Sequence, residues 1–472
     1  MKKIFSLLFI MSMSLVFVKA NNVVLSNIAL NGQNTANDFT LVNFNISWEN
    51  SWRTNTNENN YDGAWIFVKF RKKNASVWQH ATMNYVSPGT AAACGHTQPS
   101  GSQIRTASDG KGVWMNRASV GSGTNNWTGA KLRWNYGVDG VLDNDSVEVR
   151  VFALEMVYVT PGAFNLGSGG SEYYHFRDGA VDTYFPINSE NAITCGNAAG
   201  NLWTSSNGTY WFNGTLPAAW PKGYNAFWVM KYEISQQQYV DFLNCIDYNK
   251  YLNRNPYSSS YTSGAHPNLS ALNPERAIGY ISGLDVLAML DWAALRPLTE
   301  LEFEKACRGG NQLPIADEYA WGNTSITPLS VPTNAGTATE TWAIGNCNYS
   351  SSVNTQIRCG ALATSTSDRT SSGATYYGIM EMSGNVHEWA ITGYDTEGRS
   401  FTGTHGDGYL SPAGEANALN WPSNSGSGMG LHGGGFGNTA GYMCISDRSS
   451  ASYNTIPKNS INIGGRGGRT AE

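Results

Sequence analysis

Apolar and polar residues alternate along several short segments of the first third of the chain, which is the pattern of a half-buried β-strand. Residues 42–48 alternate strictly, residues 64–70 form a denser apolar run typical of a central strand, and residues 147–151 alternate again. The Gly, Asn and Ser clusters between these segments are typical of turns. The pattern therefore predicts an all-β sandwich over residues 21–154.

The aromatic residues of this region admit two interpretations. Six tryptophans could fill the core of the sandwich, or they could form a flat platform for a glycan; they are Trp48, Trp52, Trp65, Trp78, Trp114 and Trp134. Of the two uses, we predict core packing. The apolar pattern then continues through residues 153–159 without a flexible linker, so we expect the sandwich to be joined rigidly to the region that follows.

Two helices are expected in the rest of the chain. Ser235 and Gln238 have the spacing of a capping box. Thr299 and Glu302 repeat that spacing, with apolar residues in the flanking staple positions. Three acidic residues crowd the start of the second helix: Glu300, Glu302 and Glu304. They could form a catalytic cluster, but capping and the helix dipole explain them better.

The first 20 residues have a basic start, an apolar run and a small-residue cleavage site at Ala20. They predict a Sec signal peptide over residues 1–20 that is cleaved near Ala20, and hence a secreted or cell-surface protein without a membrane span. Charged residues make up 14% of the chain and the net charge is -5, which argues against a nucleic-acid partner. Seven cysteines leave at least one unpaired or joined to another chain.

Several longer segments carry sequence motifs that are more specific than an apolar pattern or a helix cap. Residues 378–389 interleave glycine with oxygen-bearing side chains and end in Gly-Asn-Val-His-Glu-Trp, and residues 295–310 carry the capped acidic helix. Together with residues 156–168, 227–235 and the closing segments at 444–448 and 461–466, they resemble the formylglycine-generating-enzyme/sulfatase-modifying-factor family. That resemblance implies an α+β, C-type-lectin-like fold with much irregular loop over residues 155–472.

The resemblance also implies a structural calcium site. In the family the Gly-Asn-Val-x-Glu-Trp motif wraps Ca²⁺, a hard cation that takes six to eight oxygen ligands. Carried over by position, Glu381 and Glu388 would supply carboxylates, and Gly384 and Val386 would supply carbonyl oxygens. A second family site would begin near Asn346. The alternative is a buried, hydrogen-bonded turn without metal.

The oxidase activity of the family depends on two cysteines, five positions apart, that bind Cu(I) as thiolates. The corresponding positions here are Asn438 and Met443, with Cys444 one place away. We therefore expect no copper and no catalytic residues.

Three functions stay open at this stage. The first, which the missing cysteine pair favours, is a non-catalytic cell-surface or extracellular structural protein that assembles with other subunits or with itself. The second is a calcium-dependent protein that binds a glycan or another surface ligand, as a lectin or adhesin does. The third is a formylglycine-generating-type oxidase, or a related metal-dependent oxidoreductase, with an altered site. Fold alone does not decide among them.

Overall fold

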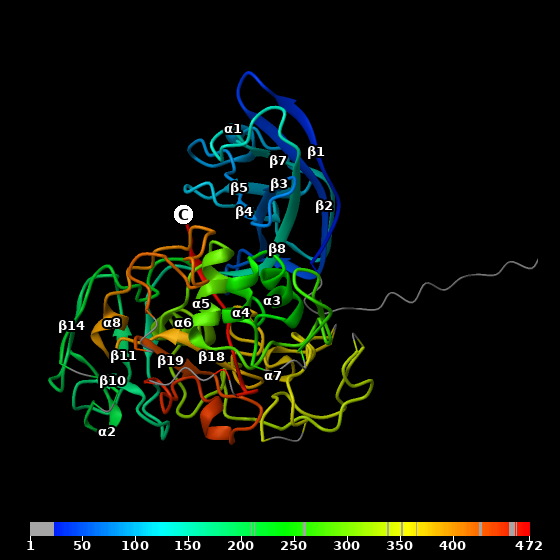
Figure 1. The fold of residues 1–472 in the computed structure, drawn as a ribbon. Helices are drawn as coiled ribbons and strands as arrows, with labels where there is room; N and C mark the ends of the chain where they lie inside the picture. The colour runs from blue at the N-terminus through cyan, green and yellow to red at the C-terminus, as the bar shows by residue number, and fades with distance from the viewer. Residues whose placement is uncertain are drawn as a thin grey trace, which may run out of the picture.

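A computed structural model describes residues 23–208, 210–211, 213–257, 261–337, 339–350, 353–364, 366–423, 427–452, 458 and 460–472. The predicted signal peptide lies outside these residues. Strands and loops dominate, with short helices between them (Figure 1), as the α+β prediction requires.

The strands are β1 (Val24–Asn34), β2 (Phe39–Arg53), β3 (Asp62–Lys72), β4 (Gln79–His80), β5 (Ser102–Thr106), β6 (Val113–Arg117), β7 (Gly121–Trp134), β8 (Val147–Val159), β9 (Phe164–Leu166), β10 (Phe176–Asp178), β11 (Phe185–Ile187), β12 (Ile193–Cys195), β13 (Leu202–Thr204), β14 (Gly214–Leu216), β15 (Phe227–Met230), β16 (Thr262–Ser263), β17 (Ser270–Ala271), β18 (His387–Ile391), β19 (Met429–His432), β20 (Ile463–Gly464) and β21 (Gly468–Thr470). The helices are α1 (Ala91–Cys94), α2 (Ser205–Gly208), α3 (Gln236–Leu243), α4 (Tyr248–Arg254), α5 (Gly283–Trp292), α6 (Glu300–Arg308), α7 (Arg369–Ser372), α8 (Thr396–Arg399) and the 3₁₀ helix η2 (Ala440–Met443).

Two sheets pack face to face in the first third of the chain. The antiparallel sheet β1-β2-β7 lies against a larger sheet that contains β3, at the top of Figure 1. Phe44 and Ile46 of β2 meet Ile66 and Val68 of β3 in one apolar cluster. The side chains of β2 alternate between buried and half-buried, so the predicted strand alternation is confirmed.

The larger sheet contains strands from both parts that the sequence distinguishes, residues 21–154 and residues 155–472, which we call the two halves of the chain. Its strand order is β21-β15-β8-β3-β6-β5, with β4 added beside β3. On one edge of β8, residues 147–157 pair with β3 along the whole length of β3, while residues 156–159 pair with β15 on the other edge. The boundary expected between residues 154 and 155 therefore falls inside a single strand, and the division into two domains stays a prediction.

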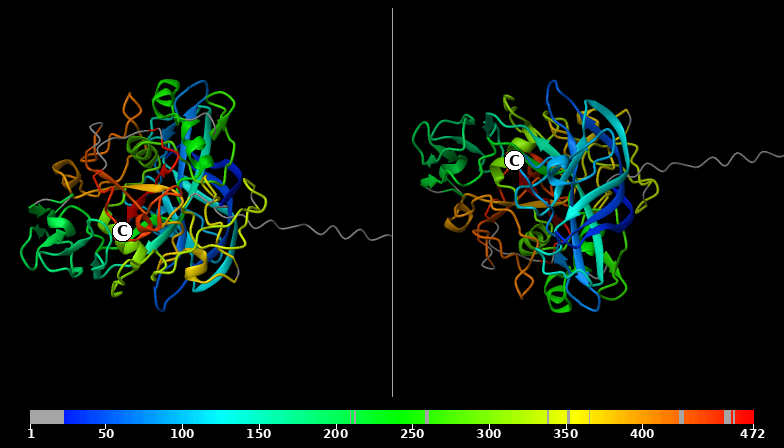
Figure 2. Two further views of the ribbon diagram at one scale, coloured as in Figure 1. Left: turned by 90° about the horizontal axis from the view of Figure 1, so that it is seen from below. Right: turned by 90° about the horizontal axis from the view of Figure 1, so that it is seen from above.

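Side chains also join the two halves. The buried ammonium group of Lys231 lies 3.0 Å from Glu155 and 3.5 Å from Asp62. The indole nitrogen of Trp65 donates to the carbonyl of Ala293 at 2.8 Å. Figure 2 shows the strands of the first third lying directly over the later segments. Five of the six tryptophans considered above are buried and Trp52 is partly buried, so their predicted packing role is confirmed.

The remainder of the chain forms short elements tied together by loops. Small sheets (β10-β13-β12-β14, β9-β11, β16-β17 and β19-β18-β20) surround α3, α5 and α6. The capping boxes predicted at Ser235 and Thr299 are both present. In the described part of the chain, no helix is long and apolar enough to cross a bilayer.

Candidate functional site: buried charges at residues 378–389

The loop that precedes β18 turns sharply over residues 381–385, because three residues of this stretch have left-handed backbone. Glu381, Gly384 and Asn385 have φ angles of 54°, 95° and 65°. At Gly384 a Cβ atom would lie 2.5 Å from Cys347 Sγ and 2.8 Å from the carbonyl oxygen of Asn348, so only glycine fits. The turn brings Glu381 and Glu388 into one buried region.

Glu388 is held by an arginine from the end of the chain. Arg466 Nε lies 2.5 Å from Glu388 Oε2, and Arg466 Nη2 lies 2.6 Å from Glu388 Oε1. Both side chains are about 1% exposed. Because this bidentate contact uses both carboxylate oxygens, a cation could bind Glu388 only in competition with the guanidinium group.

A third carboxylate, that of Glu233, lies beside this pair. It accepts hydrogen bonds from the backbone nitrogen of Val386 at 3.0 Å and from the Asn385 amide. Burial, followed by the charges of Glu388 and Glu381, raises the pKa of Glu233 well above its usual value. Burial lowers the pKa of Arg466, but the Glu388 carboxylate outweighs that effect, so the pKa is raised overall. The carboxyl groups of Glu233, Glu381 and Glu388 thus share one buried region with Arg466, and Arg358 also acts on Glu381.

Glu381 is the member of this group with a free oxygen. Its Oε1 accepts from the backbone nitrogen of Gly360 at 2.7 Å, while its Oε2 is buried and has no hydrogen-bond partner. Burial raises the pKa of Glu381 to about 7, and Arg466 partly opposes that rise. The Oδ1 atom of Asn348 is also buried without a partner. Both residues line a cavity of about 10 Å³, which is the space of one water molecule or ion.

The residues that the family resemblance assigns to the calcium sites differ in whether they have an oxygen free to bind a cation. Asn346 lines the same cavity, but its Oδ1 accepts from the backbone nitrogen of Thr327 at 2.8 Å. Glu381 and Asn348 present free oxygens, whereas Glu388 does not. Among the described residues, no three His, Cys, Asp or Glu side chains are grouped so as to hold a metal ion. A cation between Glu381 and Asn348 would need further ligands from backbone oxygens or water, and the calcium site stays a prediction.

The positions that correspond to the copper ligands carry no thiol. Asn438 accepts from the backbone nitrogen of Gly435 through Oδ1 at 3.1 Å, and Met443 is fully buried. The nearby Cys444 Sγ donates to the carbonyl of Asp317 at 3.5 Å, and burial raises its pKa. All seven cysteines lie in the described part of the chain, where each is buried and unpaired. A hydrogen bond with Tyr319 lowers the pKa of Cys444, but burial outweighs it, and no two of the seven cysteines form a disulfide.

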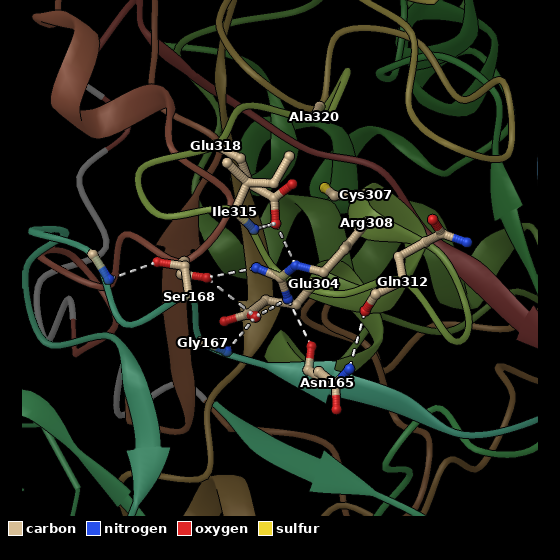
Figure 3. A network of polar contacts seen from close by, with 12 residues as sticks. Asn165, Gly167, Ser168, Glu304, Cys307, Arg308, Gln312, Ile315, Glu318 and Ala320 are labelled. Atoms are coloured by element: carbon tan, nitrogen blue, oxygen red, sulfur yellow. Dashed lines mark hydrogen bonds and ion pairs between the residues drawn. The ribbon is translucent and has the colours of Figure 1, made fainter. Parts of the chain in front are cut away.

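The acidic residues of α6 form buried ion pairs with arginines, as Glu388 does. Glu302 caps the helix and also forms an ion pair with Arg296 at 2.7 Å, while Glu300 pairs with Arg448 at 2.8 Å. Figure 3 shows Glu304 and Glu318 on either side of Arg308, at 2.9 and 2.5 Å. Capping was therefore the correct explanation for Glu302. The ion pair of Glu300 was not visible in the sequence, because Arg448 lies on another segment, whereas Glu304 and Arg308 are four positions apart on the same helix.

These features, a β-rich scaffold with capped short helices and a glycine-dependent loop in front of a buried Glu-Trp strand, define a sulfatase-modifying-factor fold. The family model described as "Sulfatase-modifying factor enzyme 1-like domain" matches residues 148–465. The chain belongs to this family. No curated protein matches it by sequence. Among solved structures, "Treponema denticola variable protein 1" is similar at 15% identity, with a TM-score of 0.33, over 68% of this chain and 96% of that one.

Proposed function

We propose that this protein is exported and serves as a non-catalytic structural or assembly component at the cell surface or outside the cell, built on a sulfatase-modifying-factor scaffold. The observation that carries the proposal is the identity of Asn438 and Met443. An amide and a thioether cannot act as the pair of thiolates that copper oxidase chemistry requires. The lone neighbouring thiol, Cys444, is buried against a backbone carbonyl.

The join between the two halves supports a role as a building block. A subunit transmits its orientation to its neighbours only when its own parts do not rotate against each other. β8 pairs with strands of both halves, and Lys231, Glu155 and Asp62 form a buried ionic cluster across the seam. We therefore propose that other subunits, or further copies of this chain, are its partners.

The native mass of the chain beginning at Asn21 tests this proposal. The mass should be measured by light scattering with and without a chelator, and the particles should be imaged by negative stain. We expect polymers or large ordered particles. A monomer whose mass ignores the chelator would overturn both the assembly role and the calcium site. Oxygen consumption in the presence of a cysteine-containing peptide would instead support an oxidase.

Calcium-dependent ligand binding is the second candidate, and the free oxygens of Glu381 and Asn348 favour it. Calorimetry with Ca²⁺ on metal-free protein provides the test. We expect saturable binding to the wild type and a loss of at least tenfold in affinity in Glu381→Gln, which keeps the volume and removes the charge. Glu148→Gln, on the exposed part of β8, is the matched control and should bind Ca²⁺ as the wild type does. Absence of binding to the wild type would contradict this candidate.

A further inference from the structure

The outer face of the large sheet is covered only in part. Trp65 and Phe67 of β3 are packed under the later half of the chain, with Trp65 bonded to Ala293 and Phe67 in contact with Trp292. Toward the other end of this face lies a cavity of about 580 Å³, within the size range of small-molecule sites. The residues that line it come from both halves and from the last two residues of the chain: Arg53, Tyr61, Tyr85, Ser87, Pro88, Gln103, Arg105, Thr106, Ala107, Trp114, Asn116, Tyr158, Trp228, Ala471 and Glu472.

Strand register explains why aromatic residues gather there. Tyr158 of β8 is the register partner of Trp228 on β15, and Trp114 of β6 is the partner of Arg105 on β5. Trp114 and Trp228 stack with ring centroids 4.2 Å apart, and Gly63 of β3 lies close to the Trp228 ring. This packed aromatic floor is fixed before any ligand arrives, which lowers the entropic cost of binding.

The cavity also carries positive charge. Arg53 lies over the Tyr61 ring at 4.4 Å and donates one hydrogen bond to the carbonyl of Arg117. Arg105 is exposed, and no hydrogen bond or ion pair of its side chain is found within the described ranges. Burial raises the pKa of Tyr61, while Arg53 and Arg105 both lower it, so both guanidinium groups act on this phenol.

The acidic residue at the rim does not neutralise these arginines. Glu472 Oε2 accepts from the backbone nitrogen of Ser108 at 2.6 Å, and its Oε1 lies 3.7 Å from Arg469. Neither Arg53 nor Arg105 has a carboxylate partner among the described residues. The cavity thus carries two guanidinium groups and the one carboxylate of Glu472, which is ion-paired with neither of them, and this surplus of positive charge fits an anion.

We propose that this cavity binds an acidic saccharide, a sugar ring that carries a carboxylate. The carboxylate would lie between Arg53 and Arg105, since guanidinium groups match carboxylate geometry. The amides of Gln103 and Asn116 and the tyrosine hydroxyls can donate to and accept from sugar hydroxyls. Tyr85, 38% exposed at the rim, would contact the face of the ring. The site is distinct from residues 378–389 and needs no calcium.

Calorimetry on the chain beginning at Asn21 tests this proposal, with a trimer of galacturonic acid as the probe. We expect saturable binding that weakens with added NaCl, because the contact is ionic and partly exposed. A chelator should leave the affinity unchanged. Arg105→Gln should weaken binding at least tenfold, and Tyr85→Ala should weaken it about threefold to tenfold. Both changes affect exposed side chains, so the fold should persist, which circular dichroism would verify.

Arg71→Gln is the matched control, because Arg71 is an arginine on the same sheet that pairs with Glu148 away from the cavity. It should bind the probe as the wild type does. Maltotriose tests the need for the carboxylate and benzoate tests the need for the sugar. The proposal would be overturned if the galacturonate trimer does not bind, if maltotriose or benzoate binds equally well, or if Arg105→Gln has no effect.

Discussion

Most of the buried side chains between β2 and β3 are apolar, whereas around β18 and α6 arginines are buried as deeply as the tryptophans. Arg296, Arg308, Arg448 and Arg466 are among the largest fully buried side chains of the described protein. The difference follows from the backbone structure of the two regions, which is paired strand in the first and mostly loop in the second. Long paired strands satisfy their own N–H and C=O groups, so apolar packing completes that core.

Loops leave carbonyl oxygens without backbone partners, and a buried carbonyl without a hydrogen bond is costly. Arginine carries five donors, so it can satisfy several carbonyls at once. Arg466 donates to the carbonyls of Met230 and Met380, and Arg448 donates to those of Tyr174 and Tyr210. The glutamates then balance the charge. The irregular half of the molecule is therefore organised by buried arginines and the regular half by apolar side chains.

The strongest test of this comparison is Arg466→Met. It would leave Glu388 buried without its partner and two backbone carbonyls without this donor, so we expect a loss of about 3 to 5 kcal/mol in the free energy of unfolding. Urea denaturation followed by circular dichroism would measure the loss. In the double variant Arg466→Met/Glu388→Met much of the loss should be recovered, because the unpaired charge is removed. A single variant within 1 kcal/mol of the wild type would contradict the organising role of this arginine.

Lys69 is a buried ionisable side chain in the regular half, so its effect on the stability of the fold should depend on pH. Its ammonium group donates to the carbonyl of Gly408 at 2.7 Å, and burial lowers its pKa from 10.5 to about 7. Since the folded state then binds fewer protons than the unfolded state between pH 7 and 10.5, this lysine destabilises the fold fully below pH 7 and progressively less above it.

Relative to Lys69→Met, the wild type should therefore gain about 2 to 3 kcal/mol of stability between pH 6 and pH 9. Urea denaturation of both proteins at the two pH values would measure this change. Parallel stability curves for the two proteins would show that Lys69 does not titrate in the folded state in this range.

The smallest effect is expected from Ile46→Val in the apolar core. Removing one buried methylene should cost about 0.5 to 1.5 kcal/mol, with no dependence on pH or salt. Thermal unfolding at two salt concentrations would measure it. A strong salt dependence of the difference would mean that charges contribute to this core as well, and the two halves would then not differ as described.

Local features could be predicted from the sequence, while long-range pairings could not. The capping boxes at Ser235 and Thr299 and the alternation in β2 depend on residues within a few positions of each other. The contacts of Glu388 with Arg466 and of Glu300 with Arg448 join residues 78 and 148 positions apart. The sequence offered one signal, the arginines at the ends of the closing segments 444–448 and 461–466.

For the candidate cation site too, local features could be predicted from the sequence and long-range contacts could not. The motif at residues 378–389 pointed to the loop that carries the free oxygen of Glu381, and Glu381 could be named from its position in that motif. That Arg466 occupies both oxygens of Glu388 and that Asn348 has a free oxygen depend on how distant segments meet. Neither could be derived from spacing, because no local pattern sets the distance between those side chains.

The position of β8 in the middle of the large sheet has a consequence for the order of folding. During synthesis β3 and β8 can pair early, but the other edge of β8 stays open until residues 227–230 are made, and the outer edge of β15 stays open until residues 468–470 follow. An open strand edge is a template for pairing with another chain. Non-local pairing of this kind also slows folding. The chain is thus prone to aggregate from the completion of β8 until residues 468–470 are made, when β21 covers the edge of β15.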